Sequence, residues 1–376
     1  MNNNVKWIWQ HKKWPEFNFQ AETIMAELEN VIRTVAPLNL LASELNQEKQ
    51  LTLESLVLLE ETLSTAKIEG EMLDRESVRS SIAKRLGVGQ VKRTNRSAEA
   101  FVDVLLDSVR FYNEPLSESL LHKWHAMMFY EKSILNDMLI GEYRDETMQI
   151  VSGHYGKQTL HYQAPCDNQL CVTNEMNKFL KWLNSETKLS GYIKAAIAKF
   201  WFVTVHPFDD GNGRLSRIIA ERVLAISESS PIRLYSISYE IEKNRHEYYD
   251  LLEKMQRNGS ADPKSGIDLS EWIIWFLQQI TAAAESSMRR LEKIRFSTQF
   301  WDNNRHTVFN QRQTKLIERL LETDDFEPAG ISRSKYKSLA HTTDITAARD
   351  LKDLVEKKIL RPIGEGRSRK YLIKAD

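Results

Sequence analysis

The run of apolar residues from Ile193 to Val205 constrains the fold more than any other stretch of the sequence. Its only charged side chains are Lys194 and Lys199, and it reads as a helix. A helix that is apolar on nearly all sides has to be surrounded by other parts of the protein. Pro207 follows closely, which is consistent with a helix that ends just before His206. The sequence therefore predicts a buried helix here.

Amphipathic helices are predicted in most of the remaining chain. Between Phe19 and Arg85, stretches such as LTLESLVLLEETLSTAKI repeat apolar residues at steps of three and four among Glu, Ser and Lys. Hydrophobic residues make up 41% of the 376 residues, which is enough to form cores, and this length predicts two or three domains. The expected fold class is mainly α.

Two segments depart from the helical pattern. From Tyr143 to Pro165, alternating apolar residues flank a turn predicted between Gly153 and Gly156, which indicates a β-hairpin. The N-terminus is irregular and rich in aromatic residues, and we expect it to pack as a cap over the helical core rather than to form a ligand cage. The aromatic residues of this cap are Trp7, Trp9, Trp14 and Phe17.

Charge and cysteine content exclude several classes of protein. Lys+Arg and Asp+Glu both number 52, so no global field indicates a nucleic-acid coat protein or a binder of acidic substrates. Cys166 and Cys171 are too few for a metal quartet or a disulfide scaffold, and we expect ordinary thiols in a reducing compartment. No apolar stretch is long enough to span a membrane and no signal peptide is evident, so a soluble cytoplasmic protein is expected.

The densest group of reactive residues is HPFDDGNGRLSR, residues 206 to 217. Helical periodicity resumes after Gly213, so the segment is a loop followed by a helix N-terminus, where free N–H groups and a partial positive charge attract anions. Gly211 and Gly213 allow the backbone to approach an anion closely. Arg214 and Arg217 lie one turn apart, and two cations at a helix N-terminus are unfavourable unless a polyphosphate is bound.

The other residues of this segment suit phosphate chemistry. Asp210 offers a hard oxygen ligand to Mg²⁺ that also holds phosphate oxygens. Asn212 can donate to a non-bridging oxygen, and His206 can accept a proton from an attacking hydroxyl near neutral pH. A lone histidine at a helix end or a lone Asp-Gly is more often a cap or a turn, but the joint occurrence at this spacing favours a site.

The segment is similar to the HPF-x-[DE]-GNGR-x-x-R signature of Fic-domain proteins and matches it without a departure. Members of this family are mostly α-helical enzymes that transfer AMP from ATP to a hydroxyl side chain of a target protein. Supporting resemblance extends from about Phe101 to Phe276. The resemblance implies His206 as the general base and Asp210 as the ligand of Mg²⁺. The residues implied to bind phosphates are Gly211, Asn212, Gly213, Arg214 and Arg217, and Phe208 would anchor the loop.

The hairpin resembles the flap of the same family and suggests how a target is held. An exposed strand edge beside the nucleotide can pair with an extended segment of a target through main-chain hydrogen bonds. We expect Ile150 and Val151 to form that edge. Asn244, Tyr248 and Tyr249 are candidates for the nucleoside side of the pocket, with the alternative that the two tyrosines belong to the core.

A second motif, in LSTAKIEGE, bears on regulation. Thr65, Glu69 and Gly70 fit the [ST]-x-x-x-E-[GN] inhibitory helix that similar Fic proteins carry, although Glu followed by Gly is common at helix ends. The resemblance implies that Glu69 pairs bidentately with Arg217 and occupies the guanidinium that would hold the γ-phosphate. ATP could then bind only in a pose that misaligns the α-phosphate for attack. Some Fic proteins also use this glutamate to remove AMP, and this alternative stays open.

The C-terminal part of the chain has a different pattern. From Ile331 onward we expect a short helix, a turn, a longer helix and two strands around Gly364 and Gly366, which is the order of a winged helix-turn-helix domain. The same residues contain 12 Lys+Arg against 6 Asp+Glu. The stripe predicted to be buried on the longer helix is Ile345, Ala348, Leu351, Leu354 and Val355.

This predicted winged helix allows two functions. Outward Thr346, Arg349 and Lys352 favour contact with duplex DNA, and the wing would add Arg367, Arg369 and Lys370. Interleaved acidic residues favour a protein-contact or dimerisation module instead. Both alternatives stay open at this point.

The sequence therefore predicts an N-terminal helical domain with an inhibitory helix over residues 1–95, a Fic catalytic core over 96–285, and a linker helix with a winged helix-turn-helix domain over 286–376. The preferred function is a self-inhibited adenylyltransferase that uses ATP and Mg²⁺ to modify Ser, Thr or Tyr of a target protein and of itself. The alternative is a nucleotide-sensing, DNA-binding regulator, which would need the anion site but not His206. A homodimer is left open, no membrane partner is expected, and the resemblance implies a bacterial origin.

Overall fold

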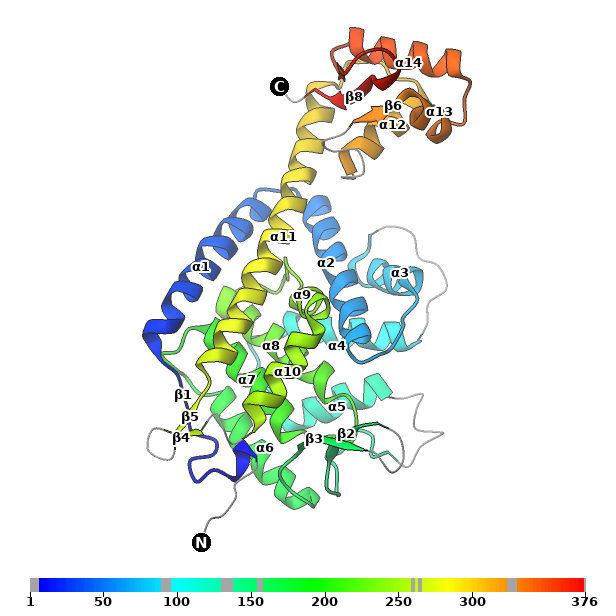
Figure 1. The fold of residues 1–376 in the computed structure, drawn as a ribbon. Coiled ribbons are helices and arrows are strands. Elements are labelled where there is room, and N and C mark those ends of the chain that lie inside the picture. The colour runs from blue at the N-terminus through cyan, green and yellow to red at the C-terminus, as the bar shows by residue number, and fades with distance from the viewer. Residues whose placement is uncertain are drawn as a thin grey trace. The chain divides into compact units, whose positions relative to one another are not determined.

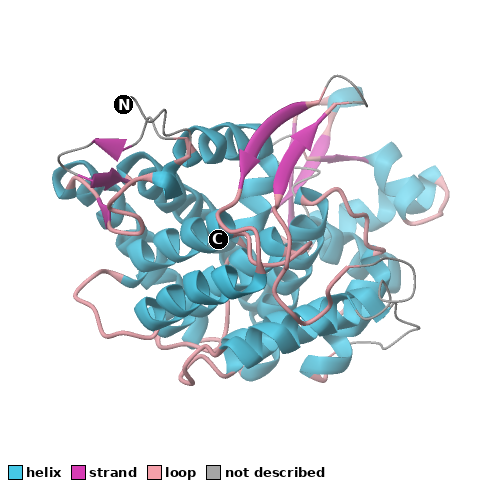
Figure 2. Cartoon of the chain, turned by 90° about the horizontal axis from the view of Figure 1, so that it is seen from below, coloured by secondary structure: helices cyan, strands magenta, loops and turns pink. Residues whose placement is uncertain are grey.

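The computed structural model describes residues 7–88, 96–129, 138–153, 158–257, 261–262, 266–322 and 330–374. The chain is mainly helical with a few short strands, which confirms the predicted fold class (Figures 1 and 2). It divides into two compact units, residues 1–288 and 289–376. The predicted boundary at residue 95 lies outside the described residues, and the one at 285 lies inside helix α11 (Ser270–Asn303). The division into three domains stays a prediction.

The first unit is built around helix α7 (Gly191–Val205), which is the predicted buried helix. Its side chains from Ala195 to Val205 are all buried, and α8 (Asn212–Glu228) and α6 (Gln169–Leu183) pack against it. Two further helices, α4 (Arg96–Arg110) and α5 (Glu118–Phe129), complete this side, with α4 packed against both α8 and α5. The segment between α7 and α8 therefore joins two helices that pack closely against each other.

The N-terminal helices are α1 (Ala21–Ser43), α2 (Gln47–Ile68) and α3 (Arg75–Leu86), and α2 packs against α3 and α9 (Ile237–Lys243). Buried carboxylates fasten α2 to its neighbours. Glu54 accepts a hydrogen bond of 2.6 Å from Arg110, and Glu61 accepts 2.7 and 3.0 Å bonds from the Ser236 hydroxyl and the Ser238 N–H. Because each broken contact would leave a buried charge without its partner, α2 is firmly held. Helix α10 (Arg245–Gln256) follows α9.

The N-terminal aromatic residues pack over the helical core, as predicted. Trp7 makes an edge-to-face contact with Tyr162, with ring centroids 5.4 Å apart, and Trp14 and Phe17 both contact Trp201. Strand β1 (Phe17–Asn18) pairs with β5 (Gly266–Asp268), which also pairs with β4 (Ala261–Asp262). The lead-in is thus a structural cap.

The predicted hairpin is formed by β2 (Gln149–Ser152) and β3 (Thr159–Gln163), which are antiparallel with a register shift between Ile150 and Val151. The turn predicted between Gly153 and Gly156 lies largely outside the described residues. On β3, Tyr162 is buried and its hydroxyl donates to the Thr204 carbonyl at 2.6 Å. The hairpin is therefore fastened to α7 at its base.

The expectation of two free thiols is wrong, because a disulfide joins Cys166 and Cys171. The two residues flank Asn168, whose side chain caps α6 by accepting from the Cys171 N–H at 2.9 Å. Cys166 has a left-handed backbone (φ 73°), and the turn brings the two Cα atoms within 5.4 Å. Counting cysteines could not reveal this pairing, since it depends on the local turn that begins α6.

The second unit contains the expected two helices followed by two strands. Helices α12 (Gln311–Glu322), α13 (Arg333–Leu339) and α14 (Asp344–Glu356) pack with an antiparallel sheet of order β6-β8-β7. These strands are β6 (Ile331–Ser332), β7 (Leu360–Ile363) and β8 (Lys370–Ile373). Their common core contains Leu316, Ile317, Tyr336, Leu351 and Leu354.

The predicted buried stripe of α14 is wrong at Ile345, which is 84% exposed. Ala347, Leu351 and Leu354 form the buried face, and Ile345 lies two residues before Ala347, roughly 200° around the helix from it. Arg349 is exposed as predicted.

None of the helices in the described residues combines the length and the apolar character that a membrane span requires.

Candidate active site

His206 lies directly after α7 and closes it in a left-handed conformation, with φ 52°. Its Nδ1 is 3.1 Å from the Val203 carbonyl oxygen, and because a carbonyl can only accept, Nδ1 carries the proton. The lone pair is then on Nε2. Burial lowers the pKa of His206 to about 4, so the ring is neutral at pH 7. The geometry thus leaves one nitrogen able to accept a proton.

Arg144 holds the backbone on either side of His206. The buried guanidinium donates from Nε to the His206 carbonyl at 2.7 Å, and the Arg144 N–H donates to the Pro207 carbonyl at 2.9 Å. The same side chain also donates to the main-chain carbonyls of Glu146, Pro165, Cys166 and Val205. Sequence reasoning missed this residue, because partners that are all main-chain carbonyls leave no side-chain pattern to find.

The loop after His206 is held by hydrogen bonds within the segment and by contacts with His125 of α5. Phe208 is buried, as predicted, and the Asn212 side chain both accepts from the Phe208 N–H at 3.0 Å and donates to the Phe208 carbonyl at 2.7 Å. His125 stacks on the Phe208 ring with centroids 4.2 Å apart, and its Nε2 is 3.2 Å from the Asp210 carbonyl. The Asn212 side chain therefore stabilises the loop, and phosphate binding by this residue stays a prediction.

The predicted anion site lies at the first turn of α8, and anion binding there stays a prediction. Gly211, the N-cap residue, has φ 82°, and a Cβ there would lie 2.6 Å from Phe129, so only glycine fits. Within the described part of the chain no side chain caps this helix end, which leaves its N–H groups for another partner. A Cβ on Gly213 would lie 2.2 Å from the Glu69 Oε1 atom. The Glu69 carboxylate thus lies directly against the helix N-terminus, where negative charge is favoured.

Arg217 is buried and contacts the end of α2. Its Nη2 is 2.6 Å from Glu69 Oε1, and its Nε donates to the Thr65 hydroxyl at 2.6 Å. The expected bidentate pair is therefore wrong, because Thr65 takes a second position on the guanidinium and Glu69 uses one oxygen. Within the described structure, Arg217 Nη1 is buried without a hydrogen-bond partner.

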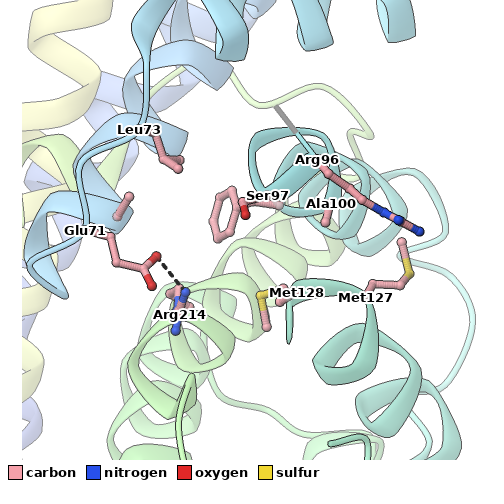
Figure 3. A pocket seen from close by; sticks show the side chains of 10 residues that line it. Glu71, Leu73, Arg96, Ser97, Ala100, Met127, Met128 and Arg214 are labelled. Atoms are coloured by element: carbon pink, nitrogen blue, oxygen red, sulfur yellow. Dashed lines mark hydrogen bonds and ion pairs between the residues drawn. The ribbon is translucent and has the colours of Figure 1, made fainter. Parts of the chain in front are cut away.

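The Glu69 carboxyl is ionised at neutral pH. Burial by itself raises its pKa, but the charge and hydrogen bond of Arg217, helped by the charge of Arg214, bring the pKa below its ordinary value. Gly70 follows with a left-handed φ of 80° and ends the helix, as the Glu-Gly pattern indicates. Glu71, the next residue, is 2.9 Å from Arg214 Nη1 through its Oε2 atom (Figure 3). The sequence motif did not include Glu71.

Asp210 is the residue that could hold a metal. Its carboxylate is about half exposed, accepts the Gly211 N–H at 2.6 Å, and lies 3.4 Å from Arg214 Nη2. The described residues contain no group of three or more His, Cys, Asp or Glu side chains that could hold a metal ion. A single accessible carboxylate fits Mg²⁺, which is often bound through one or two carboxylates with phosphate oxygens and water as the remaining ligands.

The residues predicted for the nucleoside side of the pocket are Asn244, at the end of α9, and Tyr248 and Tyr249 in α10. Tyr248 is buried, stacks on Trp275 with centroids 5.6 Å apart, and accepts a 2.9 Å hydrogen bond from Lys199, so the core alternative describes it well. Tyr249 is partly exposed and donates to the Ile68 carbonyl at 3.2 Å. Asn244 donates to the Glu240 carbonyl at 3.2 Å. Nucleoside binding by these residues stays a prediction.

The hairpin edge is accessible where the sequence predicts it. Ile150 and Val151 are 37% and 44% exposed, and in the described structure β2 pairs only with β3. One edge of β2 therefore has main-chain groups available for another strand. Binding of a target there stays a prediction.

Comparison with known proteins agrees with this geometry. Residues 115–224 match the Fic/DOC family. This chain contains a Fic/DOC domain. The region before the Fic domain, residues 7–88, matches a domain of unknown function, DUF4172.

The Fic-domain protein is similar to curated relatives named "Protein adenylyltransferase Fic". It is 38% identical to the one from Aedes aegypti over 80 residues, 21% of this chain and 15% of that protein. It is 26% identical to the one from Drosophila grimshawi over 201 residues, 52% of this chain and 37% of that protein. These matches span well under two thirds of the relatives' own length.

Solved structures show the same fold. A Fic family protein from Desulfovibrio desulfuricans G20 superposes with a TM-score of 0.55 at 16% identity, covering 96% of this chain and 98% of that one. A Fic domain containing signaling protein from Bacteroides thetaiotaomicron VPI-5482 gives 0.53 at 18% identity, covering 70% and 96%. The arrangement of α7, the loop and α8 thus belongs to a Fic fold.

Proposed function

We propose that this Fic-domain protein is a self-inhibited protein adenylyltransferase that transfers AMP from ATP to a hydroxyl side chain of a target protein and of itself. The observation that carries the proposal is the juxtaposition of a neutral His206, whose Nε2 can accept a proton, with an anion site that has two buried arginines. The names of the curated relatives support the choice of AMP as the transferred group.

In the proposed reaction the polyphosphate of ATP lies on the first N–H groups of α8 and between Arg214 and Arg217. The target oxygen forms a bond to the α-phosphorus while its proton passes to His206 Nε2. The bond from the α-phosphorus to pyrophosphate breaks, and pyrophosphate leaves with the electron pair. Mg²⁺, held by Asp210 and phosphate oxygens, would neutralise phosphate charge when bound.

The proposed inhibition is a competition for Arg217 and the α8 N-terminus. The Glu69 carboxylate lies on both, so the outer phosphates cannot take their place while Glu69 stays. Positioning supplies most of the catalysis of phosphoryl transfer, and a shifted α-phosphate is therefore poorly reactive. Because Glu54 and Glu61 fasten α2, release requires motion of the Glu69 side chain rather than of the whole helix.

The β2 edge is the proposed place for the target segment. Main-chain pairing with Ile150 and Val151 would position a Ser, Thr or Tyr hydroxyl without reading much of the target sequence. Their exposure supports this role.

Transfer of label from α-labelled ATP tests the function. We expect Glu69→Gly to raise self-modification and modification of lysate proteins above that of the unaltered protein, and Glu69→Gly/His206→Ala to lose nearly all of this label. Glu69→Gln, which keeps the size of the side chain but removes its charge, should also activate. Equal rates for the unaltered and Glu69→Gly proteins would contradict the proposed inhibition by Glu69. Label that persists without His206 would contradict the proposed role of His206 as the base.

For the second unit we propose a winged helix-turn-helix domain that contacts the DNA backbone through α14. Ile345 and Arg349 are both exposed and lie four residues apart, hence on one face of the helix, with Lys352 exposed nearby. Fluorescence anisotropy with labelled duplex DNA over a salt series tests this. Salt-dependent binding that weakens in Arg349→Ala/Lys352→Ala supports it, whereas no binding at low salt favours a protein contact.

A further inference from the structure

Two carboxylates, not one, reach Arg214 and Arg217 of α8 from the end of α2. Glu69 is the C-cap residue of α2, Gly70 is left-handed, and the N–H of Glu71 donates to the Ala66 carbonyl at 2.9 Å. Glu69 pairs with Arg217 and Glu71 pairs with Arg214. Figure 3 shows Glu71 directed toward Arg214. One turn of the chain thus supplies a carboxylate to each arginine.

We infer that Glu71 is a second inhibitory carboxylate, which occupies Arg214 as Glu69 occupies Arg217 and which an incoming nucleotide has to displace. The inference rests on the proposed function, because it treats the first turns of α8 as a polyphosphate site. It adds a residue outside the inhibitory motif and assigns it to a different arginine.

The contacts of Arg214 show why a polyphosphate can replace Glu71. Arg214 is buried, and among the described residues its acidic contacts are Glu71 at 2.9 Å and Asp210 at 3.4 Å. Its guanidinium lies over the Phe129 ring, 4.7 Å from the centroid, and its Nε is buried without a hydrogen-bond partner in the described part of the protein. A polyphosphate offers several charged oxygens, whereas Glu71 makes one contact. After the exchange, more N–H groups of the guanidinium can therefore have a hydrogen-bond partner.

Glu71 also has room to leave. Its side chain is 36% exposed whereas that of Arg214 is 8% exposed, so the acid is the accessible member of the pair. A cavity of about 60 Å³ adjoins both residues and is lined further by Ser97, Ala100 and Met128 (Figure 3). This space is enough for a carboxylate group, since a water molecule occupies about 30 Å³ in the liquid. Displacement therefore needs no movement of α2 or α8.

The inference predicts that removing Glu69 alone leaves Arg214 occupied. Calorimetric titration with ADP, in which no group is transferred, measures the effect on binding directly. We expect Glu71→Gln to tighten ADP binding about fivefold, the scale of a partly exposed ion pair. The same factor should separate Glu69→Gly/Glu71→Gln from Glu69→Gly, because each carboxylate holds its own arginine.

Glu76→Gln is the matched control. Glu76 pairs at 2.8 Å with Arg79 on the exposed side of α3, so its replacement removes a nearby carboxylate without touching Arg214. An ADP affinity of Glu71→Gln that equals that of the control, or that falls below that of the unaltered protein, overturns the inference. Circular dichroism establishes folding, and Glu71→Asp, which shortens the side chain, should tighten ADP binding in the same direction if Glu71→Gln does not fold.

The transfer assay separates this inference from the proposed function. If Glu71→Gln tightens ADP binding but no variant transfers label from ATP, the second carboxylate stands and the transferase function falls. If the variants transfer label while Glu71→Gln leaves ADP affinity and transfer at low ATP unchanged, the function stands and the inference falls. Absence of ADP binding in every variant overturns both.

Discussion

The two ends of the segment from His206 to Arg217 are held in different ways. At the first end, Arg144 donates to main-chain carbonyls and Asn212 closes the loop on Phe208. At the second end, Arg214 and Arg217 contact the carboxylates of Glu71 and Glu69, which lie just after the last residue of α2. Main-chain contacts inside the core have no competitor, whereas carboxylates can be exchanged for phosphates. We call the side of His206, the proposed base, the base end, and the side of Arg214 and Arg217 the arginine end. The base end is held by main-chain contacts, whereas the arginine end is held by carboxylates that we propose phosphates can replace.

Replacing His206, the proposed base, should change the rate of transfer more than any other substitution discussed below. In the Glu69→Gly background, His206→Ala should lower transfer by about 10²- to 10⁴-fold, the usual contribution of a general base. ADP binding should stay nearly unchanged, since the arginine end is intact. Parallel measurements of label transfer and ADP affinity check this, and an equally large loss of affinity would show that the two ends are not independent.

Replacing Arg144 should damage the base end through stability and position together. Arg144→Met leaves buried carbonyl groups unpaired, at about 1–3 kcal/mol each, so thermal unfolding should shift to lower temperature. Transfer at a temperature where the protein is folded should also fall, because the His206 backbone loses its donor.

Arg222→Met provides the control for this change. Arg222 is also buried and donates to main-chain carbonyls, those of Ser108 and Glu114, but lies away from the loop. It should lower the unfolding temperature without lowering kcat. If both variants lower kcat equally, Arg144 has no special part in positioning His206.

The pH dependence of transfer reports on the base end alone. With its pKa lowered to about 4 by burial, His206 stays neutral and able to accept a proton down to that pH. In Glu69→Gly, kcat should therefore be flat through pH 6.5 and fall only as the pH approaches about 4. An acid limb near pH 6.5 would mean that the imidazole is solvated in the active form.

The smallest expected effect concerns the arginine end and stability at acidic pH. The pKa of Glu69 is lower in the folded protein than in the unfolded chain, so the unfolded state binds more protons and the pair with Arg217 stabilises the fold above the unfolded pKa. This contribution is lost as the pH falls through the folded pKa. Chemical unfolding between pH 6 and pH 3 should therefore show a steeper loss of stability for the unaltered protein than for Glu69→Gln.

Local patterns predicted the parts of the site that lie in one continuous segment. The apolar run before His206 predicts α7, and the return of helical periodicity after Gly213 predicts α8. The side chains of Arg144 and Glu71 were missed, because their partners are distant in the chain and the sequence carries no sign of the distance. The disulfide of Cys166 and the exposure of Ile345 were missed for other reasons, because the first depends on a local turn and the second on which face of α14 the core covers.

The sequence by itself determined the mainly helical fold and the loop between a buried helix and a helix N-terminus, and it predicted the candidate base and the two arginines. These follow from periodicity and from the chemistry of neighbouring side chains. The tertiary structure decided what each arginine contacts: Thr65 and one oxygen of Glu69 at Arg217, and Glu71 at Arg214. The reason is physical, since a charged side chain takes whichever partner the packing of α2 against the core brings within hydrogen-bond distance.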